Sequence, residues 1–395
     1  MLVTYRLADA VGLDSRILVN VAGGIFILPF FLFSAPAGQL ADKYERSYLV
    51  QVLQITAIII AAAAIPAFYI GNIYFLMVVL FLMGAQSTFF GPIKYSILPQ
   101  LLHKDELIAG NGLVQMGTFL AILAGTIFGG LFILRDGGIE LTSVMVFSIA
   151  AAGWLASLYI PKTIPIAPDL KVSPNIVRGT VKIVSNVLPY REITLSILCI
   201  SWFWLVGITF LSQFPTYSKL VIGADEQVAT LFLATFSVGI GLGSMACNGF
   251  LKGQISVRYV PWAAVAMAAA CFFLYLVSQR PPLEAGTPDL GIVAFLSSWE
   301  NIAIVACLLA ISFAGGLYIV PLYTMIQART DKSRMAGVVA CSNVSDSFFM
   351  VLSAIVISIL LAVGMDIPHI FLVISVLTLV VAVVIRKYVV NNVNQ

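Results

Sequence analysis

Residues 38–46, with the sequence GQLADKYER, decide the fold of this chain because they separate two long apolar stretches, residues 17–40 and 48–70. Each stretch is long enough to span a bilayer, which takes about 20 helical residues. The join is too short for a domain and too charged for lipid, so we expect a tight turn on one membrane face. Asp42 can lie at a neighbouring helix N-terminus, where the helix dipole favours an anion. Lys43 and Arg46 indicate the cytoplasmic face under the positive-inside rule.

The composition agrees with a membrane protein. Hydrophobic residues make up 61% of the chain and charged residues only 10%, against roughly 25% charged residues in soluble domains. Long unbroken apolar runs favour an all-α polytopic membrane protein over a β-barrel, which would show short alternating strands. The basic residues are spread singly, so we expect no nucleic-acid partner. All five cysteines lie in apolar stretches, so we expect no disulfide framework, metal site or cofactor.

The apolar pattern predicts about eleven complete transmembrane helices. We expect them near residues 17–40, 48–70, 73–90, 107–134, 141–159, 193–214, 227–250, 257–279, 302–325, 335–363 and 367–385. Residues 239–243 (GIGLG) lie inside one of these spans without a preceding strand, so they indicate close helix packing and not a nucleotide site.

Residues 161–192 form the longest polar stretch in the middle of the chain. Ser173-Pro174 is a good helix start, and valines and Leu188 then recur at helical spacing. We expect an amphipathic helix in the cytoplasmic interface. On this plan 16 of the 21 Lys and Arg residues lie on one side, which places the linker and the C-terminus in the cytoplasm.

A few polar residues inside the spans are candidates for function. Asp346 is the only acidic residue deep within a span, with Asn343 one turn before it. A carboxylate in lipid is costly and usually marks a pathway or relay, although it can also serve only packing. Asn111 and Gln115 share a helix face and are expected to face protein or a water-filled cavity.

Aromatic residues and a proline mark two further spans. Trp202 and Trp204 can line a pocket and offer an N–H; the alternative is an aromatic belt, against which their depth of about ten residues argues. Residues 315–322 (GGLYIVPL) predict a helix broken in mid-membrane at Pro321, lining a cavity or hinge.

Two sets of motifs carry a family resemblance. Gly-x-x-x-Asp-Lys-x-x-Arg at residues 38–46 resembles the signature loop of the major facilitator superfamily, with Glu45 in place of the usual glycine. FGPIKY at residues 90–95, Asn111-Gly112, SWFW at residues 201–204 and the segment 316–327 resemble the bacterial lysophospholipid transporter family. They resemble equally the transporter domain fused to a bacterial 2-acylglycerophosphoethanolamine acyltransferase.

The resemblance implies a major facilitator fold of two six-helix halves, residues 1–160 and 193–395, joined by the linker 161–192. Residues 1–8 resemble the outer end of helix 1, so we expect most of that helix, with the family's Asn-Asp motif, to be missing from the sequence. The resemblance also implies transport of lysophosphatidylethanolamine and related lipids across the bacterial inner membrane, for reacylation inside by an acyltransferase or acyl-ACP synthetase. No enzymatic activity of the chain itself is expected.

The site residues that follow fall into two groups. The conformational signature loop comprises Gly38, Asp42, Lys43 and Arg46. The substrate path comprises Lys94, Tyr95, Asn111, Gln115, Trp202, Trp204, Tyr318, Pro321, Gln327, Asn343 and Asp346. Lys94 and Asn111 are the expected head-group contacts, and Asn343 and Asp346 stand where the family usually has asparagines.

Two other functions remain open from the sequence. A polyspecific efflux pump for amphipathic small molecules would suit an acidic residue near the midplane. A non-transporting membrane scaffold that docks an acyltransferase is the second alternative. Uptake of a labelled lysophospholipid would separate both from the transporter.

Overall fold

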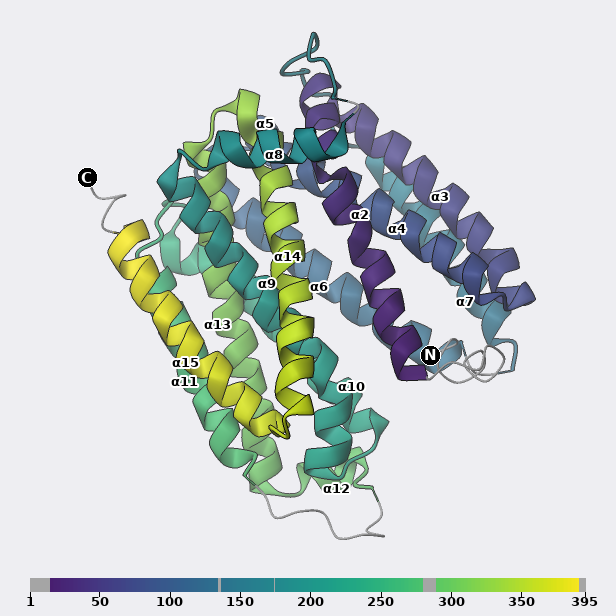
Figure 1. The fold of residues 1–395 in the computed structure, drawn as a ribbon, viewed down its shortest axis with the longest axis vertical. Coiled ribbons are helices and arrows are strands. Elements are labelled where there is room, and N and C mark those ends of the chain that lie inside the picture. Colours follow the sequence, from purple (N-terminus) through teal and green to yellow (C-terminus); the bar gives the residue numbers. More distant parts are fainter. Residues whose placement is uncertain (1–14, 134–135, 174, 280–288, 391–395) are drawn as a thin grey trace. The chain divides into compact units, whose positions relative to one another are not determined.

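The computed structural model of the chain describes residues 15–133, 136–173, 175–279 and 289–390 (Figure 1). Within these ranges, 11 helices are long and apolar enough to cross a membrane. This confirms the predicted all-α class and the predicted number of spans. The expected remnant of helix 1, residues 1–8, and Pro174 lie outside the described residues.

The helices pack into two compact units, and each is described by itself. In the first unit, α2 packs against α4 and α8, and α3 packs against α4 and α7 (Figure 1). The helices of this unit are α2 (Ser15–Lys43), α3 (Arg46–Ile70), α4 (Ile73–Ser96), α5 (Leu98–Leu101), α7 (Gly138–Ser157), α8 (Ile176–Val187) and η3 (Lys332–Arg334). The later part of α6 (Leu107–Phe132) and the first part of α14 (Met335–Ala362) also belong to it.

The second unit is built around α13, which packs against both α10 and α11, while α11 also packs against α15 (Figure 1). Its elements are α9 (Arg191–Tyr217), η2 (Ser218–Ile222), α10 (Glu226–Leu251), α11 (Val260–Val277), α12 (Ile292–Leu296), α13 (Trp299–Arg329), α15 (Ile367–Val384) and η4 (Ile385–Val390). The first part of α6 and the later part of α14 complete it. These units reflect packing and not an internal repeat, so the division into residues 1–160, 161–192 and 193–395 stays a prediction.

Glycines let α10 and α13 approach closely. A Cβ on Gly243 would collide with the carbonyl oxygen of Phe313, and one on Gly239 would collide with the side chain of Ser312. From the other helix, a Cβ on Gly316 would lie only 2.5 Å from the carbonyl oxygen of Ile240. The predicted packing role of residues 239–243 is therefore confirmed, because no other residue type fits at these backbone distances.

Two prolines do not end their helices as the sequence predicted. The expected break at Pro321 is wrong, because α13 runs without interruption through it from Trp299 to Arg329. Likewise α4 continues beyond the predicted end near residue 90, passes through Pro92 and ends at Ser96, so Lys94 lies inside a helix. A proline removes one backbone hydrogen bond, and packing in transmembrane helices tolerates that loss.

The predicted helix in the linker is present as α8. Its N-cap is Asn175, whose side chain accepts a hydrogen bond from the backbone N–H of Arg178. Gly179 is buried against α2, whereas Val177 and Val181 are 72% and 62% exposed. The helix is therefore amphipathic with an uncovered apolar face. Its place in the membrane interface stays a prediction.

Candidate functional site

The signature loop contains a buried ion pair. Arg46, the first residue of α3, is 2% exposed, and its Nη2 lies 3.2 Å from Oδ1 of Asp42 in the last turn of α2. The guanidinium also donates to the carbonyl oxygens of Ala41 and Ser96, at 3.2 and 2.9 Å. Both charges are thus compensated, and Arg46 joins the ends of α2, α3 and α4. We call Asp42 and Arg46 the signature-loop pair.

Asp42 also lies at a helix N-terminus, as the sequence predicted. Its carboxylate accepts hydrogen bonds from the backbone N–H groups of Ala336 and Gly337, in the first turn of α14. One turn earlier on α2, a Cβ on Gly38 would lie 2.8 Å from the Cβ of Ala340, one turn later on α14. The two helices therefore run antiparallel, and Gly38 permits their close approach. The conformational role of this loop stays a prediction.

Lys43 lies outside the signature-loop pair. Its Nζ lies 5.7 Å from the ring centroid of Tyr44, and its side chain is partly exposed. The positive charge on this residue is therefore not needed to compensate Asp42.

Glu45, noted from the sequence only as a departure from the family pattern, ties the linker to the loop. Its carboxylate accepts hydrogen bonds from the backbone N–H and the hydroxyl of Thr163, at 2.7 and 2.8 Å. It also caps α3 by accepting from the N–H groups of Ser47 and Tyr48. Burial raises the pKa of Glu45, but the bonds from Thr163 and Ser47 outweigh it and lower the pKa to about 2.

The linker makes two further bonds to the end of α2. The N–H of Ala167 donates to the carbonyl oxygen of Asp42 at 2.8 Å, and the N–H of Ser173 donates to Oε1 of Gln39 at 2.7 Å. No sequence pattern could have identified these contacts, because each partner lies more than a hundred residues away along the chain.

Two predicted path residues, Asn111 and Gln327, bond to each other. Asn111 Nδ2 donates to Gln327 Oε1 at 2.5 Å, and Gln327 Nε2 donates to Asn111 Oδ1 at 3.1 Å. Asn111 Nδ2 also lies 3.2 Å from Thr324 Oγ1. Both amides are buried, at 0% and 5% exposure. We call Asn111 and Gln327 the amide pair; Gln115, one turn further along α6, is equally buried.

The two tryptophans of α9 differ in their surroundings. Trp202 is buried, and its Nε1 donates to Thr378 Oγ1 of α15 at 3.2 Å. Trp204 is only partly buried, stacks on Phe119 with ring centroids 6.1 Å apart, and donates to the hydroxyl of Tyr323 at 3.3 Å. Trp202 therefore helps to hold α9 to α15, and Trp204 is the better candidate for a path residue.

Tyr318 is a further predicted path residue with a packing contact. It is fully buried in α13, and its hydroxyl donates to the carbonyl oxygen of Cys199 at 2.9 Å. Pro321 follows it in the same buried part of α13. Tyr318 therefore joins α13 to α9.

The remaining predicted residues lie on α4 and α14. Asn343 Nδ2 lies 2.6 Å from the position that a Cβ on Gly91 would take, so the amide fills the space left by that glycine. This Nδ2 is buried and has no hydrogen-bond partner among the described residues. Asp346 is 7% exposed and accepts from Ser342 Oγ at 3.3 Å. Lys94 Nζ lies 4.7 Å from the ring centroid of the adjacent Tyr95.

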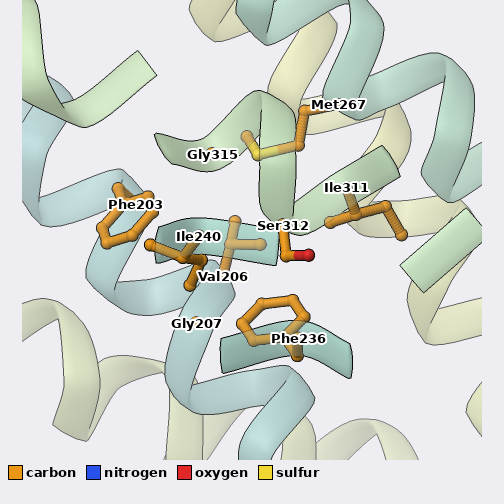
Figure 2. A pocket seen from close by; sticks show the side chains of 9 residues that line it. All are labelled: Phe203, Val206, Gly207, Phe236, Ile240, Met267, Ile311, Ser312 and Gly315. Carbon is orange, nitrogen blue, oxygen red and sulfur yellow. The ribbon is translucent and has the colours of Figure 1, made fainter. Parts of the chain in front are cut away.

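A small cavity in the second unit offers little for recognition of a polar group. Figure 2 shows side chains from α9, α10, α11 and α13 around it. It is lined by Phe203, Val206, Gly207, Phe236, Ile240, Met267, Ile311, Ser312 and Gly315. Ser312 has the only side-chain oxygen in this lining, and it already donates to the carbonyl oxygen of Leu308. We therefore place the candidate site elsewhere, at Lys94 of α4 and at Asn343 and Asp346 of α14.

Comparison with known proteins gives the family context. The sequence model described as Major Facilitator Superfamily matches residues 3–281. The "Lysophospholipid transporter LplT" of Escherichia fergusonii is 25% identical over 351 residues, which are 87% of this chain and 80% of that protein. The protein of the same name from Salmonella schwarzengrund is 28% identical over 350 residues, 86% of this chain and 78% of that protein.

Solved structures show the same fold at low sequence identity. The Escherichia coli fucose:proton symporter FucP superposes with a TM-score of 0.70 at 13% identity, covering 94% of this chain and 91% of its own. A bacterial homologue of the iron transporter ferroportin, in an outward-facing state, also gives 0.70 at 12% identity, covering 98% and 92%. These likenesses support the fold alone.

Proposed function

The chain belongs to the Major Facilitator Superfamily, and from that premise we propose that it is a secondary transporter of lysophospholipids in a bacterial inner membrane. The observation that carries the proposal is the similarity to proteins named lysophospholipid transporters, which extends over 87% of this chain. Asn343, whose buried Nδ2 has no hydrogen-bond partner among the described residues, and the buried carboxylate of Asp346 support it, since such groups within apolar helices commonly mark a substrate pathway.

We propose alternating access between the two halves of the sequence, residues 1–160 and 193–395, with the linker and the C-terminus in the cytoplasm. The signature-loop pair supports this mechanism because Asp42 binds the N-terminus of α14, which joins a helix of the first half to one of the second. Breaking that contact would accompany opening of the cytoplasmic side. The acyl chain of the substrate would lie against apolar walls, and the head group of the substrate would lie at the polar residues of the candidate site on α4 and α14.

Reacylation of the imported lipid requires an enzyme on the cytoplasmic side. An acyltransferase or acyl-ACP synthetase is therefore the partner that we propose. The chain itself would act only as the transporter.

The test is uptake of labelled lysophosphatidylethanolamine by spheroplasts that carry the chain, an empty vector or the Asp346→Ala variant. We expect uptake above the vector only with the unaltered chain, at equal protein levels in the membrane. Vector-level uptake from a well-inserted chain would refute the proposal. Resistance to cationic dyes in the same cells would then favour the efflux pump.

A further inference from the structure

The directions of α4 and α14 fix the order of their polar residues. Helix α2 runs antiparallel to α14, as described above. It runs parallel to α4, because Arg46, just beyond the end of α2, donates to the carbonyl oxygen of Ser96, the last residue of α4. Helices α4 and α14 are therefore antiparallel, and they meet where Asn343 lies against Gly91.

Lys94 and Asp346 consequently lie on opposite sides of Asn343. Lys94 follows Gly91 by three residues, towards the signature loop, and Asp346 follows Asn343 by three residues in the opposite direction. Residues three apart share a helix face. With a rise of 1.5 Å per residue, the Cα atoms of Lys94 and Asp346 are offset by about 9 Å along the helices. The order along this face is cation, amide and carboxylate.

Together these groups suit the two charged parts of a zwitterionic lipid head group, the phosphate and the ammonium. A lysine ammonium binds phosphate as a point charge. Asn343 Nδ2 is a buried donor with no partner among the described residues; such groups are rare in proteins and call for an explanation, which an oxygen atom of a ligand would supply. The carboxylate of Asp346 is only 7% exposed and accepts a hydrogen bond from Ser342 Oγ, and a carboxylate attracts a cationic group such as an ammonium.

We propose that Lys94, Asn343 and Asp346 recognise a zwitterionic phosphoethanolamine head group, with the phosphate at Lys94 and Asn343 and the ammonium at Asp346. This proposal rests on the proposed function and extends it to substrate selection. A phosphoglycerol head group has the same phosphate but no ammonium, so it engages only Lys94 and Asn343. Asp346 is then the residue that favours phosphoethanolamine.

The experiment compares uptake of labelled lysophosphatidylethanolamine and lysophosphatidylglycerol by proteoliposomes. Asp346→Asn should lower kcat/KM for lysophosphatidylethanolamine by about tenfold, as loss of a charged hydrogen bond does, and leave that for lysophosphatidylglycerol nearly unchanged. Lys94→Gln should lower both by a similar factor. Asp331→Asn, at an exposed aspartate without a side-chain cap bond before α14, is the matched control and should change neither.

A second measurement needs no variant and covers the case in which Asp346→Asn fails to fold. Acetylating the amine of lysophosphatidylethanolamine removes the positive charge and keeps the phosphate. The unaltered chain should transport this derivative about tenfold less efficiently. Equal transport of both lipids, or an equal loss for both substrates in Asp346→Asn, would overturn the assignment and leave the proposed function standing. Absence of transport for every lysophospholipid would refute the proposed function itself.

Discussion

Asn111 and Asn343 both place a buried amide nitrogen inside an apolar helix, yet the two nitrogens differ in their partners. Asn111 Nδ2 donates to Gln327, and Gln327 donates back. Asn343 Nδ2 has no partner among the described residues. Burial of a polar group therefore does not by itself indicate a binding site, because a satisfied amide joins two helices. A donor that remains unsatisfied indicates where a ligand can bind.

The signature-loop pair is of the same kind as the amide pair. The Arg46 guanidinium donates to Asp42 and to two backbone carbonyl oxygens, so its bonding capacity is largely used within the protein. We expect residues of such satisfied clusters to affect stability strongly. Asn343, whose Nδ2 makes no hydrogen bond among the described residues, should affect transport more than stability.

The largest effect is expected from Arg46→Ala. Removing the guanidinium leaves the buried carboxylate of Asp42 without its counter-charge, which should lower the free energy of unfolding by about 3–5 kcal/mol. Chemical denaturation of the purified protein in detergent measures it. Lys43→Ala, which removes a cation three residues away outside the pair, should change stability by less than about 0.5 kcal/mol. Equal losses in both variants would contradict the role of the pair.

The amide pair should give the next largest effect. Asn111→Leu leaves the buried amide of Gln327 without its partner, at a cost of about 1–3 kcal/mol. Adding Gln327→Leu removes the stranded group, so the double variant should lose less than the sum of the two single losses. Unfolding curves for the four proteins test this. Simple additivity would show that the two amides do not depend on each other.

Asn343→Leu should lower transport and leave stability nearly unchanged, the reverse of what we expect for the amide pair. The substitution removes a donor that makes no bond among the described residues and replaces it with a side chain of similar volume, so stability should change by less than about 1 kcal/mol. Uptake of lysophosphatidylethanolamine should fall about tenfold, because the phosphate loses a charge-assisted hydrogen bond. Unfolding and uptake are measured on the same preparation. A large loss of stability with normal uptake would show that Asn343 has a structural role, like the amide pair and the signature-loop pair.

The fold could be predicted well from the sequence because it depends on local properties. Runs of about 20 apolar residues are sufficient to locate transmembrane helices. The sequence predicts a turn in the charged join at residues 38–46, and the turn is confined to Tyr44 and Glu45, between the end of α2 and the start of α3. Pro321 misled the prediction, since local propensity suggests a break and packing within the membrane overrides it.

The candidate site could be predicted only in part. Residue type identified Asn111, Gln327 and Asn343 as unusual within apolar helices, but not which of them have partners. Asn111 and Gln327 lie 216 residues apart in the sequence, and one sequence carries no signal that joins them. The same holds for Thr163 and Glu45, which lie 118 residues apart.

The smallest expected effect concerns Glu45, a charged member of the satisfied clusters. Its pKa is lowered from 4.5 to about 2 in the folded protein, so the ionised carboxylate stabilises the folded state. That contribution is complete above the unfolded pKa and is lost as the pH falls through the window from 4.5 to about 2. Because the group is partly exposed, Glu45→Gln should cost only about 0.5 kcal/mol near neutral pH.

The pH dependence separates this charge effect from simple loss of packing. The difference in unfolding midpoint between the unaltered chain and Glu45→Gln should be largest near neutral pH and should shrink as the pH is lowered through that window. Thr163→Val removes one of the hydrogen bonds that lower the pKa, so it should move the loss of stability to higher pH. A difference that stays constant across the window would show that Glu45 acts through shape alone. The rule that satisfied polar groups stabilise the fold would then hold only for buried groups such as Arg46, and not for partly exposed ones such as Glu45.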